Sequence, residues 1–75
     1  MAEPPVMFAG LLRQLRIEAG LTQEELAEAA GVSVRSVRDL ERGRVATPQK
    51  ETVRLLADAL ALIGPARAGF ETAAR

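Results

Sequence analysis

The sequence predicts an all-α domain of five short helices, and three observations support this prediction. Apolar residues recur at intervals of three and four along most of the 75-residue chain, which is the period of one helix face. No segment shows the alternation of apolar and polar residues that is typical of a half-buried strand. Serine, threonine, glycine and proline residues divide the helical pattern into five segments.

The first segment predicts a helix that starts near Met7 and ends before Gly20, because glycine is favoured just past a helix C-terminus. Residues 1–6 contain two prolines, and we expect them to form a flexible leader ahead of a single domain over residues 7–75. The inner face of this first helix carries four apolar side chains at helical spacing: Phe8, Leu11, Leu12 and Leu15.

The second and third segments predict a helix pair over residues 22–42, joined by a turn at Gly31. Thr22 and Glu25 have the spacing of a capping box at the first of these helices. A glycine at the turn adopts a positive φ without steric cost. Ser33 caps the next helix, and Gly43 stops it. The residues predicted to face the core are Leu26, Ala27, Ala30, Val32, Val37 and Leu40.

The last two segments also predict helices. Thr47-Pro48 reads as a helix start, because proline suits the first helical position. Glu51 lies near that start, where the helix dipole favours a negative charge. Gly64-Pro65 then breaks the chain before a final helix over residues 66–74, with Phe70 pointing inward. The inner face of the fourth helix is predicted to carry Val53, Leu56, Ala57 and Leu60.

The composition excludes several classes of function. The chain has no cysteine and no histidine, which argues against disulfides, thiol chemistry and the usual zinc sites. It also lacks a glycine-rich loop that cradles phosphates, so we expect no enzyme activity, no metal, no cofactor and no small-molecule substrate. No apolar run approaches the roughly 18 residues of a membrane span, and we expect a cytoplasmic protein that does not contact a membrane.

Charge is unevenly distributed along a chain that is neutral overall, with ten basic and ten acidic residues. Neutrality argues mildly against a stand-alone DNA-binding protein, because neutralising phosphates supplies most non-specific affinity. However, residues 35–44 carry four arginines against two acids, whereas Glu24, Glu25 and Glu28 gather on the preceding helix. This separation indicates one positive face, although ordinary solvated charge has a similar pattern over so short a window.

A helix that starts at a serine cap and carries Arg35, Ser36 and Arg38 has the form needed to reach base edges in a DNA major groove. Arg35 has the geometry to bind guanine O6 and N7 with both arms of its guanidinium. Arg38, one turn further on, has two open readings, a base edge or a phosphate. Asp39 follows Arg35 by four residues and either orients it or accepts from a cytosine amine; we favour orientation.

Three further positions also have two readings each. Val34 either packs on a thymine methyl or continues the core stripe of Val37 and Leu40, and we favour its exposure. Arg42 and Arg44 read either as phosphate contacts or as solvated loop residues, with equal weight.

Residues 8–62 resemble the helix-turn-helix domain of phage-repressor type, often called the XRE family. The motifs that carry the resemblance are Leu21-Thr22-Gln23, Leu26-Ala27, Gly31-Val32-Ser33, Leu40-Glu41-Arg42-Gly43 and Pro48. Residues 33–43 and 51–60 are similar to the N-terminal module of large multidomain regulators from GC-rich bacteria. The resemblance implies a compact, phage-repressor-like fold with a recognition helix at about residues 33–42, and sequence-specific binding of double-stranded DNA in transcription regulation.

The resemblance also implies roles for particular residues. Gln23 would start the first helix of the pair at the DNA backbone and bond a phosphate; the alternative is an ordinary polar residue in the first helical turn, and we favour the DNA role. Arg16 with Glu41 would form a largely buried ion pair of structural importance. Together with the reading of the residues above, this gives one expected DNA-binding set: Gln23, Ser33, Val34, Arg35, Ser36, Arg38, Asp39, Arg42 and Arg44.

A second hypothesis is that the same fold serves as a protein-interaction or self-association module with weak DNA binding. The neutral total charge favours it, as do apolar residues beyond those the core needs. We expect a homodimer or further domains of a larger regulator to be possible partners in either case. The apolar residues that motivate this hypothesis are Leu55, Leu62, Ile63 and Phe70.

Overall fold

The computed structural model describes residues 8–45 and 48–75 and contains five α-helices and no strand within those stretches, which confirms the all-α prediction. The Cα radius of gyration is 11.5 Å, close to the roughly 11 Å expected for a compact chain of this length. The predictions for residues 1–6, Met7 and Thr47 fall outside the described residues. The helices are α1 (Phe8–Glu18), α2 (Gln23–Ala30), α3 (Val34–Glu41), α4 (Lys50–Ala59) and α5 (Gly64–Ala73).

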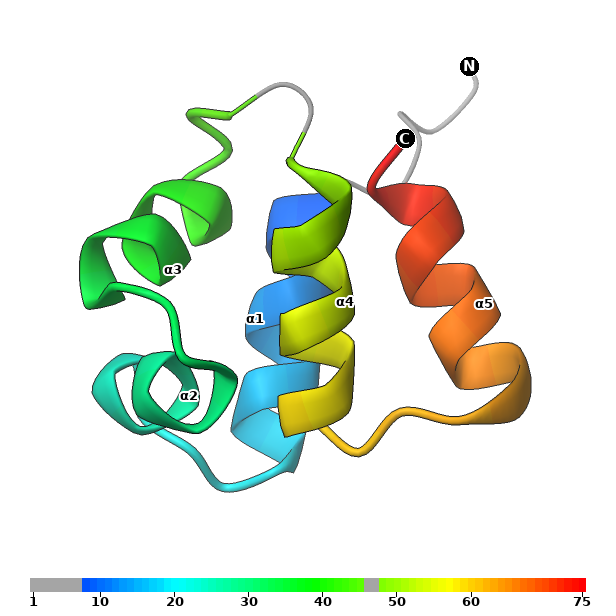
Figure 1. Cartoon of the computed structure of the whole chain (residues 1–75), viewed down its shortest axis with the longest axis horizontal. Helices are drawn as coiled ribbons and strands as arrows, with labels where there is room; N and C mark the ends of the chain where they lie inside the picture. Colours follow the sequence, from blue (N-terminus) through cyan, green and yellow to red (C-terminus); the bar gives the residue numbers. More distant parts are fainter. Residues whose placement is uncertain (1–7, 46–47) are drawn as a thin grey trace, which may run out of the picture.

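The helices α3 and α5 lie on opposite sides of the molecule. In Figure 1, α1 and α4 occupy the middle of the view, with α2 and α3 at the left and α5 at the right. The α2 helix packs on α3 and α4, whereas α5 packs on α1 and α4. The outer surface of α3 is therefore not covered by the C-terminal helix.

Each helix contributes one large side chain that is completely buried: Leu12, Leu26, Val37, Leu56 and Phe70. All five belong to the faces that the sequence predicts to be inward, so that part of the prediction is confirmed. The Phe70 ring lies 4.9 Å from the ring of Phe8, in a tilted arrangement that attaches α5 to the start of α1. In α2, Ala27 and Ala30 are also buried, and such small side chains allow a neighbouring helix to approach closely.

Local signals define the ends of α2 as predicted. The Thr22 hydroxyl accepts the backbone N–H of Glu25 at 3.0 Å, and the Glu25 carboxylate accepts the backbone N–H of Thr22 at 2.8 Å. These reciprocal bonds are a capping box and satisfy two donors that a helix start leaves unpaired. Gly31 ends α2 with φ +74°, the left-handed conformation that glycine adopts without strain.

The start of α4 differs from the prediction. The helix begins at Lys50 with Gln49 as its cap residue, so Pro48 lies just ahead of the helix rather than in its first turn. Pro48 and Val53 are both buried. They occupy the two positions of a hydrophobic staple, in which an apolar residue before the cap packs near the fourth helical residue. Burial of the proline ring explains why it stays outside the helix.

The start of α5 also differs, in the opposite direction. This helix begins at Gly64, two residues ahead of the predicted start, and includes Pro65 in its first turn. Proline breaks the bonding of a preceding helix, but it is well suited to the first turn of a new one, where its missing N–H would have no helical partner. Gly64-Pro65 therefore opens α5 instead of preceding it.

Candidate nucleic-acid interface

A tight turn fixes the angle between α2 and α3. The backbone N–H of Gly31 donates to the carbonyl of Glu28 at 3.2 Å, and that of Val32 donates to the carbonyl of Ala27 at 3.0 Å. These bonds satisfy the last carbonyls of α2, and Val32 packs against the core. The chain then enters α3 through the cap at Ser33. The turn thus positions α3 through backbone bonds and one apolar contact.

The first turn of α3 is held by a pair of serines. The Ser33 hydroxyl accepts the backbone N–H of Ser36 at 3.1 Å and donates to the Ser36 hydroxyl at 2.9 Å. Both capacities of Ser33 are therefore used inside the helix start. The Ser36 hydroxyl is exposed, and its hydrogen has no acceptor among the described residues, so it is available to an external group.

The two faces of α3 separate sharply. Val37 and Leu40 are buried, whereas Arg35, Ser36 and Arg38 are exposed. The Arg35 side chain is 88% exposed. The base-reading candidates at 35, 36 and 38 therefore share the outer surface of one helix.

Val34 differs from the expected exposure. Its side chain is half-buried and packs against the core cluster. The three-residue spacing of Val34, Val37 and Leu40 explains this, because residues three apart share a helix face. The predicted exposure is therefore wrong for the inner part of this side chain, and only its outer part reaches solvent.

A carboxylate at the end of α3 joins three other segments. Arg16 in α1 donates from Nε to Glu41 Oε2 at 2.6 Å and from Nη2 to Glu41 Oε1 at 3.0 Å. Its remaining arm, Nη1, donates to the Leu21 carbonyl at 2.9 Å. Gln23, at the start of α2, donates from Nε2 to Glu41 Oε1 at 3.1 Å. The two charged side chains are only 13% and 4% exposed.

The contact with Glu41 raises the pKa of Arg16, chiefly through the hydrogen bond and to a smaller degree through the opposite charge, while desolvation acts in the other direction. Arg16 therefore keeps its positive charge at neutral pH. The pair also takes Glu41 away from the protein surface. Of the two acids in residues 35–44, Glu41 is thus neutralised internally and cannot repel an approaching phosphate.

The basic residues of this segment stay at the surface. Arg38, Arg42 and Arg44 are exposed, and none of them forms an ion pair within residues 8–45 and 48–75. Arg35 has only a long contact, in which its Nε lies 3.9 Å from Asp39 Oδ2. The Asp39 side chain is 31% exposed, so it is placed to orient Arg35 while remaining partly shielded. The surface of this segment therefore carries four exposed arginines and one half-buried acid.

A shallow hollow of about 300 Å³ runs along α3 toward the start of α4. Gln49 and Thr52 bring an amide and a hydroxyl to its α4 side, and Ser36 and Asp39 line its α3 side. The sequence reading did not select Gln49 or Thr52. The sequence does predict a helix start close to these two residues. However, only the packing of α4 beside α3 brings them to the hollow.

Comparison with known proteins identifies the type of domain. Residues 7–69 match the family model described as a helix-turn-helix domain. The chain belongs to this helix-turn-helix family. The recognised region includes α2, the turn at Gly31 and α3, which form the two-helix motif itself.

Three curated proteins illustrate the relatives of this helix-turn-helix domain. The chain is 50% identical to the HTH-type transcriptional regulator DdrOP3 of Deinococcus deserti over 46 residues, covering 61% of this chain and 35% of that protein. It is 40% identical to the HTH-type transcriptional repressor RghR of Bacillus subtilis over 53 residues, covering 71% and 39%. An uncharacterised HTH-type transcriptional regulator of Methanothermobacter thermautotrophicus is 56% identical over 34 residues, covering 45% and 49%. The matches span less than half the length of each relative.

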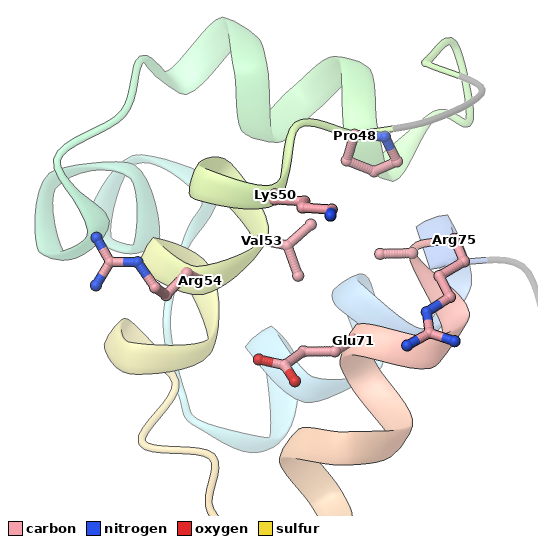
Figure 2. Close-up of a pocket in the computed structure, with 7 residues that line it drawn as sticks. Pro48, Lys50, Val53, Arg54, Glu71 and Arg75 are labelled. Carbon is pink, nitrogen blue, oxygen red and sulfur yellow. The ribbon is translucent and has the colours of Figure 1, made fainter.

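A second hollow in the helix-turn-helix domain lies between the start of α4 and the end of α5. It measures about 450 Å³, and Figure 2 shows its lining residues. Val53 and Ala74 supply apolar surface, and Lys50 and Arg75 stand at its sides. Pro48 lines both this hollow and the one beside α3.

Three of the four apolar residues that favour a self-association module are accounted for by the core. Phe70 is completely buried, and Leu55 and Leu62 are half-buried against the core cluster. The interpretation of Phe70 as a spare apolar residue is therefore wrong. Ile63 is 80% exposed and is the member of that group that stays in solvent.

Within the described part of the helix-turn-helix domain, no cluster of three or more His, Cys, Asp or Glu side chains is arranged to hold a metal ion. None of the helices in that part is long and apolar enough to span a bilayer.

Proposed function

We propose that this helix-turn-helix domain binds double-stranded DNA in a sequence-specific manner for a transcriptional regulator, with α3 in the major groove. The observation that carries the proposal is the charge on α3 and the turn after it. Four arginines are exposed there, whereas Glu41 is buried in an ion pair and Asp39 is partly shielded. Such a surface attracts phosphates and presents guanidinium groups to guanine edges.

The exposed side of α3 supplies the groups that would read bases. Arg35 projects from the first half of the helix and has the two-armed geometry that guanine O6 and N7 accept. The Ser36 hydroxyl offers a donor, and Arg38 extends the same surface by nearly one turn. The solvent-facing part of Val34 is suited to a thymine methyl. In this arrangement Ser33 acts through its cap, and Asp39 acts by holding Arg35.

Residues near the C-terminal end of α3 would contact the phosphate backbone. Arg42 and Arg44 are exposed in the turn after the helix, and Gln23 brings an amide to the start of α2. Contacts of this kind set the position of a protein on the duplex and supply salt-dependent affinity. The proposed role is one of binding without catalysis, and the proposed location is the cytoplasm.

The total charge is neutral and the relatives are longer, which favours DNA binding that is strengthened by additional protein. A second copy on a neighbouring half-site, or further domains of a longer regulator, would supply it. The exposed Ile63 favours self-association as the second candidate function. Sedimentation of the wild type and of Ile63→Asp tests that candidate, which predicts a mass above the monomer that the substitution lowers.

Selection from a randomised pool of duplexes tests the main proposal. We expect enrichment of one short motif, with an affinity that falls steeply as salt increases. The logarithmic slope against salt should become shallower by about 0.9 for each phosphate contact removed, so Arg42→Ala and Arg44→Ala should each reduce it. A pool that shows no enrichment, together with binding that ignores salt, would contradict the proposal.

A further inference from the structure

The hollow between the start of α4 and the end of α5 has an apolar floor and charged sides. Pro48, Val53 and Ala74 line it from the inside, and all three residues are buried. Core packing therefore holds this apolar surface in place before anything binds to it. The volume of about 450 Å³ falls within the range of roughly 300–1,000 Å³ that is typical of small-molecule sites.

Two cations at the sides of the hollow are available to a bound molecule. Lys50 and Arg75 are exposed, and neither forms an ion pair with any residue that the structure describes. Figure 2 shows the Lys50 side chain extending from α4 toward α5, with Arg75 on the α5 side. The hollow thus lies between two positive charges that come from different helices.

The other two charged residues of the lining already have partners. Arg54 pairs with Glu51 at 2.5 Å, and Glu71 pairs with Arg67 at 3.3 Å. Each is therefore largely neutralised by a neighbour that does not line the hollow. What remains for a bound molecule is the charge of two cations beside an apolar floor.

We propose that this hollow is an effector site for a small apolar molecule that carries one carboxylate. The apolar body would cover the floor and supply most of the affinity, because removing apolar surface from water is the main favourable contribution. The carboxylate would pair with Lys50 and Arg75 and set the orientation of the molecule. A bare inorganic anion would leave the floor exposed to water, and an uncharged molecule would leave both cations without a partner.

The start of α4 connects this site to the surface beside α3. Pro48 lines both hollows, and Gln49 and Thr52, from the same helix start, line the hollow beside α3. A ligand that contacts Pro48 stabilises the described position of this helix start, and so holds Gln49 and Thr52 beside α3. We therefore expect occupancy of the effector site to tighten DNA binding. This coupling rests on the proposed function, whereas binding of the ligand does not.

An NMR titration with three acids and their amides tests the effector site. Octanoate, hydrocinnamate and naphthylacetate are each compared with the primary amide of the same acid, which keeps the apolar body without the charge. Acetate is the control that keeps the charge without the apolar body. For at least one of the three acids, we expect saturable shifts that are confined to backbone amides bordering the hollow: those of Lys50, Val53, Glu71, Ala74 and Arg75.

The acid should bind about three- to tenfold more tightly than its amide, since exposed ion pairs contribute modestly to affinity. Lys50→Gln and Arg75→Gln should each reduce this advantage, whereas Lys50→Arg, which keeps the charge, should retain it. Both positions are exposed, so these variants should fold like the wild type. Arg13→Gln is the matched control, because Arg13 is an exposed arginine of α1 that does not line the hollow.

Three results would overturn the effector site. One is equal affinity for an acid and its amide, and another is an equal response to acetate. The third is the absence of saturable binding by any of the three acids. Shifts that spread over the whole domain, or an equal loss of affinity in Arg13→Gln, would also contradict a site at this hollow.

A second titration measures the coupling to DNA with the acid that binds most tightly. Affinity for the duplex enriched by selection is measured by fluorescence anisotropy with saturating acid, and with the same concentration of acetate to keep the ionic strength constant. We expect the acid to tighten DNA binding about fivefold, and by linkage the duplex should tighten binding of the acid by the same factor. Unchanged or weaker DNA binding would overturn the coupling. If the wild type selects no duplex at all, the proposed function fails, and the NMR titration alone decides the effector site.

Discussion

The two ends of this domain use surface charge in contrasting ways. Between α4 and α5, five charged side chains are joined in a continuous series of ion pairs. Arg54 pairs with Glu51 at 2.5 Å and approaches Asp58 at 4.0 Å, and Arg67 joins Asp58 at 2.7 Å to Glu71 at 3.3 Å. On α3 and the turn after it, four exposed arginines have one long contact, the 3.9 Å approach of Arg35 to Asp39, within the described residues.

This difference explains how a neutral chain can present a positive surface. Acids in the α4–α5 region neutralise the two arginines beside them, Arg54 and Arg67. In the α3 region one acid is buried against Arg16 and the other is partly shielded. Net charge therefore says little about binding here, because the arrangement of pairs decides which arginines are available to a partner.

The largest expected effect comes from breaking the ion pair that supports α3. Glu41→Ala leaves Arg16 largely buried without its carboxylate, and we expect a loss of about 3 kcal/mol in the free energy of unfolding. Urea denaturation followed by circular dichroism measures it. Glu71→Ala, which removes an exposed acid from the α4–α5 series, is the control. Equal losses in the two variants would contradict the structural contrast between the regions.

Removal of Arg35 should affect DNA binding without affecting stability. Because the side chain is 88% exposed, Arg35→Ala should leave the unfolding midpoint unchanged. We expect its affinity for the selected duplex to fall by about 1–3 kcal/mol, the usual value of a two-armed guanine contact. Fluorescence anisotropy with a labelled duplex measures the loss. Full affinity in the variant would remove Arg35 from the base-reading surface.

Arg67→Ala should give the opposite pattern with a smaller amplitude. The substitution removes the contact of Arg67 with Asp58, which connects α5 to α4, and its contact with Glu71 within α5. We expect a modest decrease in Tm, below that of Glu41→Ala, and an unchanged affinity for the selected duplex. Thermal denaturation and the same anisotropy titration provide both values. A decrease in DNA affinity would show that the positive surface extends onto α5.

The smallest expected effect is on the acid dependence of stability. The hydrogen bond from Arg54 lowers the pKa of Glu51 from its ordinary value of 4.5. The stabilisation is therefore present above that value and is lost as the pH falls through the lower pKa of the folded state. Wild-type Tm should fall slightly more than that of Glu51→Gln between about pH 5 and about pH 3. Parallel curves would mean that this exposed pair contributes nothing.

Much of the fold could be predicted because its signals are local. The capping box of Thr22 and Glu25, the left-handed glycine at position 31 and the serine cap at position 33 each depend on residues a few positions apart. The inward faces were also readable, since helical periodicity depends only on spacing. Predictions failed where a neighbouring element competed with the local signal. Burial of Pro48 moved the start of α4, and core packing drew Val34 inward.

The sequence by itself therefore determined the number and order of the helices, the turn between α2 and α3 and the candidate residues on α3. Its resemblance to a known family also indicated the pairing of Arg16 with Glu41. The tertiary structure alone decided that Gln23 joins this pair, and which charges remain available at the surface. The physical reason is distance along the chain: Gln23 and Glu41 are 18 residues apart, and only the packing of α2 against α3 brings them within hydrogen-bond distance.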